Sequence, residues 1–166
     1  MAAHLFVAVA AHAQSYCVRA GATGSGNGSS WDNAYPSLPS TLVRGATYYV
    51  ADGTYSGYTF STAVSGTSVV TVKKATVAEH GPSTGWQDSY GDGVAQFNGQ
   101  INVTKSYFVF DGVTGGGPGN WTNGLGFKVV VTSASPTIAI NMSQFSASAS
   151  DITFAHIETV GNDGSN

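Results

Sequence analysis

Two ionisable residues near the end of the chain have a spacing that suits proton transfer or metal binding. His156 and Glu158 are two positions apart in a β-rich run, so an extended chain directs both side chains to one face. If Ile152 and Phe154 face the core, strict alternation would bury this pair too, so a bend near Ala155 is required for it to reach solvent. A surface pair without catalysis is the favoured interpretation.

A second group with chemical potential is the adjacent pair Lys73 and Lys74, which follows the apolar run 69–72. A polysaccharide lyase needs a cation that neutralises a uronate carboxylate and a basic side chain that removes the neighbouring proton. The two lysines can line a groove for such a substrate. An adjacent lysine pair after a strand is equally typical of a solvated corner that prevents edge-to-edge pairing.

The carboxylates offer weaker patterns. Asp88 and Asp92 lie in a segment with a faint likeness to a calcium-binding loop, but position twelve would be Gly99 instead of a bidentate Glu. An ordinary turn is the favoured interpretation, and a Ca²⁺ site is the alternative. A glycoside hydrolase would need two carboxylates about 5 to 9.5 Å apart. The candidates are too scattered to pair from sequence: Asp88, Asp92, Asp111, Asp151 and Glu158.

Aromatic side chains in loops can stack on sugar rings. Trp86, Trp121 and Tyr90 are the candidates for carbohydrate binding, because each lies among turn-forming residues with Asn or Ser nearby to hydrogen-bond hydroxyl groups. Other aromatic residues are expected to fill the core.

The composition narrows the classes of partner. Only 9% of the 166 residues are charged, with six Lys and Arg against nine Asp and Glu, while 42% are hydrophobic. Such a chain has enough apolar side chains to fold, and it has no basic stripe that would bind a phosphate backbone. A nucleic acid partner is therefore not expected. Cys17 is the single cysteine, which excludes an intrachain disulfide and a cysteine-based zinc cluster.

The first residues resemble a signal peptide. An apolar run at 5–11 precedes Ala11-His12-Ala13, which fits cleavage before Gln14, although the start of the chain has no Lys or Arg. We expect residues 1–13 to be removed and the protein to be secreted, extracellular or at the cell surface. No later apolar run approaches the ~20 residues of a membrane helix, so no membrane span is expected.

Short β-rich runs, divided by Gly, Asn, Asp and Ser, must position these residues. They are 15–20, 47–50, 58–60, 69–72, 101–103, 107–110, 128–131, 137–140 and 151–154. Such runs indicate an all-β fold, either an antiparallel sandwich or a solenoid. Their recurrence at one or two intervals of 20-odd residues favours the solenoid. Three dipeptides suit corners between its faces, namely 52–53, 98–99 and 111–112.

One helix is expected. Apolar residues fall at a helical spacing between Trp31 and Leu42, although Pro36 and Pro39 limit the segment to short turns. We therefore predict a short capping helix after the first strand and its Gly/Ser-rich loop, within an N-terminal unit at 14–46.

The segment 44–55, RGATYYVADGTY, resembles the first coil of right-handed parallel β-helix proteins of the pectate-lyase-like superfamily. The upstream strand, loop and short helix resemble the amphipathic cap of such solenoids, and 106–112 and 151–160 resemble later coils. The resemblance implies a right-handed parallel β-helix with coils over 47–166. It does not select one activity, because the superfamily includes lyases, hydrolases, tailspikes and adhesins.

Two functions follow as expectations. The first is an extracellular protein that binds or degrades polysaccharide, in a lyase-like manner. The second is a non-enzymatic structural or adhesive protein whose uncapped C-terminal end stacks on another subunit to form filaments. A chain that is one piece of a longer enzyme would equally explain the missing second cap.

Overall fold

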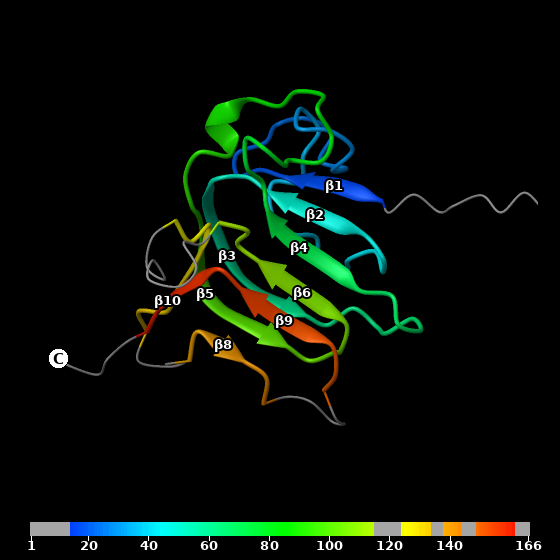
Figure 1. The fold of residues 1–166 in the computed structure, drawn as a ribbon, viewed down its shortest axis with the longest axis vertical. Coiled ribbons are helices and arrows are strands. Elements are labelled where there is room, and N and C mark those ends of the chain that lie inside the picture. The colour runs from blue at the N-terminus through cyan, green and yellow to red at the C-terminus, as the bar shows by residue number, and fades with distance from the viewer. Residues whose placement is uncertain (1–13, 115–123, 134–137, 144–148, 162–166) are drawn as a thin grey trace, which may run out of the picture.

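The computed structural model describes residues 14–114, 124–133, 138–143 and 149–161, and these form an all-β structure (Figure 1). The only helical element in those ranges is the 3-10 helix η1, Asp88–Tyr90. The strands are β1 Ser15–Val18, β2 Thr47–Val50, β3 Gly53–Phe60, β4 Val70–Lys74, β5 Ala95–Val103, β6 Phe108–Asp111, β7 Phe127–Val130, β8 Ile140–Asn141, β9 Ile152–Ala155 and β10 Ile157–Val160.

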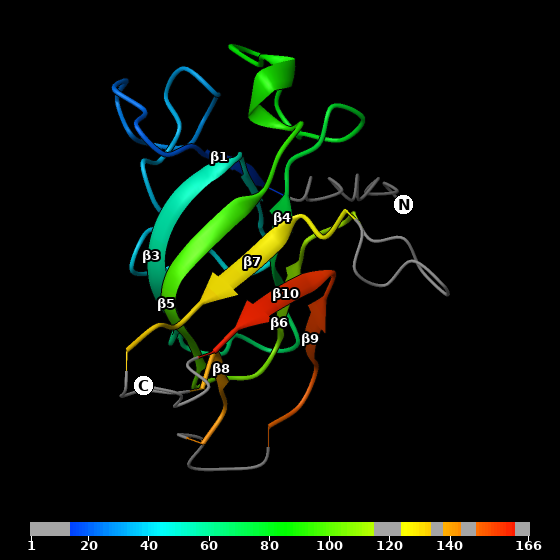
Figure 2. The same cartoon turned by 90° about the vertical axis from the view of Figure 1, so that its left-hand side faces the viewer.

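Two sheets share these strands, and every strand pair in them is parallel. We call the sheet with the order β1-β2-β4-β6-β9 sheet A, and the sheet with the order β10-β7-β5-β3 sheet B. Strand β8 also pairs with β5. From β2 to β7 the chain alternates between the sheets, so each circuit adds one strand to each (Figures 1 and 2). This arrangement is compatible with the predicted β-solenoid and excludes the antiparallel sandwich.

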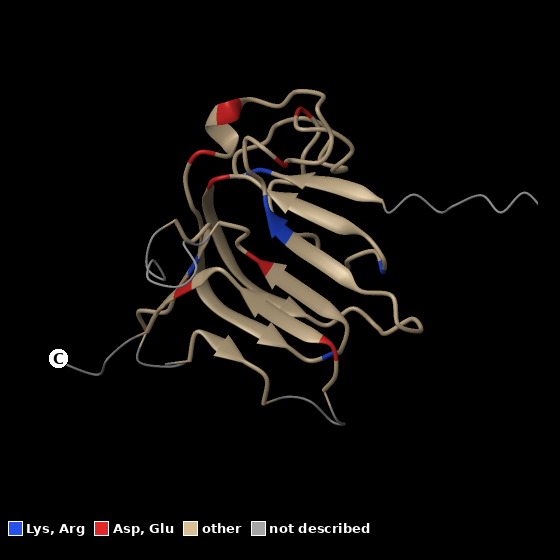
Figure 3. Ribbon diagram, viewed as in Figure 1, with Lys and Arg blue, Asp and Glu red and all other residues tan. Residues whose placement is uncertain are grey.

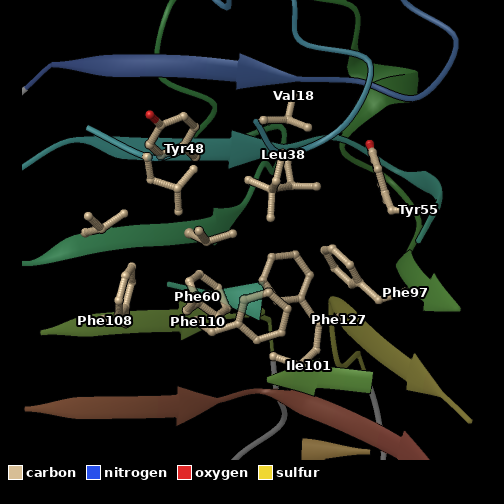
Figure 4. Packing of buried hydrophobic residues seen from close by; sticks show 14 of the residues in the cluster. Val18, Leu38, Tyr48, Tyr55, Phe60, Phe97, Ile101, Phe108, Phe110 and Phe127 are labelled. Carbon is tan, nitrogen blue, oxygen red and sulfur yellow. The ribbon is translucent and has the colours of Figure 1, made fainter. Parts of the chain in front are cut away.

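Alternating side chains explain the core between the sheets. Along β6, Phe108 and Phe110 are buried while Val109 and Asp111 lie on the outer face, as the period of two requires. The parallel register places equivalent positions in columns, so buried aromatic rings from both sheets meet inside (Figure 4). The rings of Phe110 and Phe127, one from each sheet, stack with centroids 4.4 Å apart.

The predicted capping helix is absent, because residues 31–43 contain no helical element. The apolar positions are buried as their spacing suggested, but in two different places. Trp31 packs in a small cluster on the outer face of sheet A, whereas Leu38 and Leu42 enter the main core. An irregular chain can divide its apolar residues in this way, and the two prolines remove backbone donors that a helix would need.

The same segment closes the free edge of sheet A. Tyr35 forms a parallel bridge with Val18. The Tyr35 N–H donates to the carbonyl of Cys17 at 2.9 Å, and the Cys17 N–H donates to the carbonyl of Gly28 at 2.8 Å. The outer edge of β1 is therefore satisfied by backbone from residues 28–35 without a helix.

Two of the three predicted corners are confirmed. The dipeptide 52–53 lies at the junction of β2 and β3, which begins at Gly53, and 111–112 lies where β6 ends. The third prediction is wrong, because 98–99 lies inside β5. There the ladder between β3 and β5 shifts register, since two residues of β5 oppose the single residue Gly57. A bulge, rather than a corner, explains the Asn-Gly pair.

Candidate functional site

The bulge in β5 shapes a groove on the outer face of sheet B. Gly57 and Gly99 allow the two backbones to approach closely: a Cβ on Gly57 would lie 2.6 Å from the carbonyl oxygen of Gln100. Gly99 has a φ of 120°, a conformation that favours glycine. Strand β7 pairs with β5 only as far as Asn98, and β8 pairs with it from Ile101. The groove lies where β7 leaves β5.

Its volume is about 540 Å³, and its uncharged wall combines amide and hydroxyl side chains with two valines. The lining consists of Gln96, Asn98, Gly99, Gln100, Val130, Val131, Thr132 and Ser133. Volumes of this size are typical of small-molecule sites. No Asp, Glu, His, Lys, Arg or aromatic residue is among these lining residues of the described chain.

Hydrogen bonds hold the amide groups of the groove in place. The Gln96 Nε2 donates to Asn98 Oδ1 at 2.7 Å. The Gln100 Nε2 donates to the carbonyl of Ile138 at 2.8 Å, which links β5 to the chain before β8. Beyond the bulge, Asn141 Nδ2 donates to Asn102 Oδ1 at 3.1 Å. The first of these bonds uses Gln96 Nε2 and Asn98 Oδ1, so Gln96 Oε1 can still accept and Asn98 Nδ2 can still donate a hydrogen bond to a ligand.

His156 and Glu158 do not act as a pair. The predicted bend is confirmed, because β9 ends at Ala155 and His156 turns the chain into β10 with a φ of 53°. His156 Nδ1 lies 2.6 Å from Asp111 Oδ1, whereas Glu158 Oε1 lies 3.0 Å from Lys128 Nζ. A carboxylate that accepts from Nδ1–H leaves Nε2 as the basic nitrogen, so the histidine and Asp111 have the geometry of an oriented general base.

The two adjacent lysines lie on opposite faces of β4. Lys73 is on the outer face, where its Nζ lies 2.6 Å from Glu79 Oε2. Lys74 is 1% exposed and lies 2.5 Å from Asp52 Oδ1, so the predicted solvated corner is wrong for Lys74. Alternation explains the difference, because Lys74 continues the buried series that begins with Val70. Figure 3 shows this charge at the end of β4, with most of both sheets uncharged.

The buried ion pair has further polar contacts. Lys74 Nζ also donates to the carbonyl of Ala75 at 2.5 Å, and Asp52 Oδ2 accepts from the Gly93 N–H at 2.5 Å. Burial lowers the pKa of Lys74, and the hydrogen bond and the charge of Asp52 oppose that shift, with a smaller contribution from the charge of Asp92. At 2.5 Å from Lys74 Nζ, Asp52 Oδ1 is close enough for a charge-assisted contact with the ammonium group. This pair lies at the corner between β2 and β3 and is not among the lining residues of the groove in sheet B.

Two of the predicted sugar-stacking residues belong to an aromatic cluster outside sheet A. The ring of Trp86 stacks on His80 with centroids 4.1 Å apart and meets the edge of Trp31 at 4.8 Å. Tyr90 contacts Trp86 and is covered by the guanidinium of Arg19, 4.8 Å from its ring centroid. One face of Trp86 is thus already occupied. Trp121 lies outside the described residues.

The predicted calcium ligands are separated by their contacts. Asp88 Oδ1 accepts from Trp86 Nε1 at 3.0 Å, while the charge of Asp92 acts on Lys74 and slightly raises its pKa. Within the described ranges, no group of three or more His, Cys, Asp or Glu side chains is placed to hold a metal ion.

The amide residues of the groove were not among the predicted site residues, although the sequence carries a signal for them. In the run AQFNGQINV, amide residues alternate with buried apolar residues, which is the signature of a strand with a polar outer face. Interpreting 98–99 as a corner divided this run and concealed the pattern.

Comparisons with protein-family models, curated proteins and solved structures find no match for this chain. None of the helical segments among the described residues is long and apolar enough to cross a membrane.

Proposed function

We propose that this protein is a secreted, right-handed parallel β-helix protein, related in architecture to the pectate-lyase-like superfamily, that binds polysaccharide in the groove of sheet B. The observation that carries the proposal is the groove itself, with Gln96, Asn98 and Gln100 presented by a bulged strand. Bulges often re-aim side chains next to binding sites.

Several features support the architecture and location. Strands that alternate between two parallel sheets need crossovers, and such crossovers are right-handed in about 98% of cases. The apolar start of the sequence and its Ala-His-Ala site support export. A surface rich in uncharged polar residues suits contact with hydroxyl-bearing polymers.

Binding is favoured over cleavage, because the described lining of the groove offers no acid, base or cation. The oriented base formed by His156 and Asp111 lies at the corner between β9 and β10 and is not among the lining residues. Cleavage therefore has no complete set of groups in the groove.

Assembly into filaments is the alternative proposal. An end-to-end contact would add the last strands of one subunit to the first strand of the next. In this structure the outer edge of β1 is already engaged by residues 28–35, so stacking would have to displace those hydrogen bonds. This argues for glycan binding as the leading function.

The test is a glycan-array screen of the full chain, followed by titration calorimetry with the best ligand. We expect Gln96→Ala and Asn98→Ala to weaken binding, because each removes a group that faces the groove. Thr153→Ala, an exposed change on the outer face of sheet A, is the matched control and should bind normally. Absence of any glycan binding, or binding that both groove variants retain in full, would refute the proposal.

A further inference from the structure

The charges around the groove carry an inference about the class of glycan, which rests on the proposed function. We propose that the groove selects neutral polysaccharides, with vicinal hydroxyl groups and no carboxylates, and excludes the uronate chains on which lyases act.

The groove offers no positive charge to a uronate. A carboxylate that leaves water for a site without a compensating cation pays a large desolvation cost. The chain has six Lys and Arg residues, and none lines the groove. Four of them are engaged elsewhere: Arg19 over Tyr90, Arg44 with the carbonyl groups of residues 62, 63, 106 and 107, Lys73 with Glu79, and Lys74 with Asp52. Lys105 follows the end of β5, beyond Val103.

The remaining cation, Lys128, is the nearest to the groove and is neutralised. It pairs in register with Gln96, so it sits beside the groove on the same outer face of sheet B. Its Nζ lies 3.0 Å from Glu158 Oε1, and Glu158 pairs in register with Lys128 on the adjacent strand. The two opposite charges on neighbouring strands leave this edge of the groove without net charge.

Hydrogen bonding in the groove also favours a neutral ligand. The bond from Gln96 Nε2 to Asn98 Oδ1 fixes two amides side by side on the outer face of sheet B, with Gln96 Oε1 as an acceptor and Asn98 Nδ2 as a donor for a ligand. A hydroxyl group can both donate and accept, so two neighbouring hydroxyls satisfy the acceptor and the donor together. A carboxylate accepts only; it can use Asn98 Nδ2, but its charge is repelled by the two amide oxygens.

The preformed amide pair also reduces the entropic cost of binding, because its side chains are already held by a hydrogen bond. The ligand class is therefore a neutral hexose or pentose chain, recognised through hydroxyl pairs.

The experiment compares neutral oligosaccharides, from β-glucan, xylan and mannan, with oligogalacturonate of equal length, by calorimetry on the full chain. We expect a neutral oligosaccharide to bind with an affinity that changes less than about twofold between low and high salt, because no ion pair forms. Asn98→Ala should weaken that binding by about 2- to 10-fold, the usual loss for one hydrogen bond. Thr153→Ala again serves as the control.

A variant that frees the charge of Lys128 tests the selection of neutral glycans separately from glycan binding itself. Glu158→Gln leaves Lys128 without its partner while Glu158, 48% exposed, is tolerant of the change. We expect this variant to gain oligogalacturonate binding and to keep its affinity for the neutral ligand.

Two results would overturn the inference. Selective oligogalacturonate binding by the unmodified protein, abolished by Asn98→Ala, would refute neutrality and leave the proposed function intact. Failure of every glycan to bind would refute both.

Discussion

The buried pair of Lys74 and Asp52 allows a quantitative prediction about stability. In Asp52→Asn the acceptor for the Gly93 N–H can be kept, but Lys74, 1% exposed, loses its counter-charge. The lysine then stays charged without a partner or becomes neutral. Neutralising it at pH 7, against an ordinary pKa of 10.5, costs at most about 5 kcal/mol, at about 1.4 kcal/mol per unit. We expect a loss of about 3 to 5 kcal/mol in the free energy of unfolding.

The pH dependence identifies the cause. The folded pKa of Lys74 is already lowered by burial and should fall further in this variant, so the cost is fully present below the folded pKa. It shrinks as the pH rises toward 10.5 and is limited to about 2 kcal/mol at pH 9. The assay is urea unfolding followed by circular dichroism at both pH values.

Two further variants complete a double-mutant cycle. Lys74→Met leaves Asp52, 18% exposed and still bonded to Gly93, so a smaller loss of about 1 to 3 kcal/mol is expected. The double variant Lys74→Met/Asp52→Asn removes both charges and should unfold within about 2 kcal/mol of the unmodified protein. A cost for Asp52→Asn below about 1 kcal/mol at pH 7, or an equal cost at pH 9, would show that the pair is not desolvated as the structure indicates.

Three other predictions concern backbone, thiol and surface charge. Gly57→Ala should lower the free energy of unfolding by about 1 to 3 kcal/mol in urea melts, because its Cβ would meet the Gln100 carbonyl oxygen at 2.6 Å; unchanged stability would contradict the bulge geometry. Burial raises the pKa of Cys17 from 9.0 to about 12, so the stability that the protonated thiol provides below pH 9 is lost as the pH rises toward 12. Cys17→Ala should flatten that alkaline decline in denaturant midpoints, and an unaltered slope would assign it to other groups. Asp111→Asn should cost less than about 1 kcal/mol, because His156 is 42% exposed and water screens the pair; a larger loss in thermal melts would indicate a desolvated contact.

The all-β class and much of the strand pattern were predictable from local sequence. The run 47–50 and the run 107–110 alternate large apolar residues with others, and both form strands close to the predicted bounds. The bend at His156 was predictable as well, because burying His156 and Glu158 together would be costly. Both the alternation of apolar residues and the presence of a charge at a position that would be buried can be recognised in a single sequence.

The predictions that were wrong concerned features that depend on contacts between segments far apart in the sequence. Alternation from Val70 through Val72 does place Lys74 inside, but accepting a buried lysine requires knowing that Asp52 lies opposite, and nothing local identifies this partner. The helical spacing between Trp31 and Leu42 correctly marked buried residues, yet it could not show that they enter two separate clusters. The groove depends on where β7 leaves β5, which is a matter of long-range register.

Pairing of each strand with the equivalent strand of the preceding circuit makes the fold tolerant of insertions between strands and intolerant of insertions within them. Thr47 pairs with Thr71, 24 positions on, whereas Phe108 pairs with Ile152, 44 positions on. The strands thus keep their pairing register although the spacing between paired residues nearly doubles. This is possible because the entropic cost of closing a loop rises only slowly with its length. Segments that join two strands, such as 61–69 between β3 and β4, should therefore accept inserted residues, as the loops of a display scaffold do. A single residue inserted within a strand would instead turn its buried side chains outward.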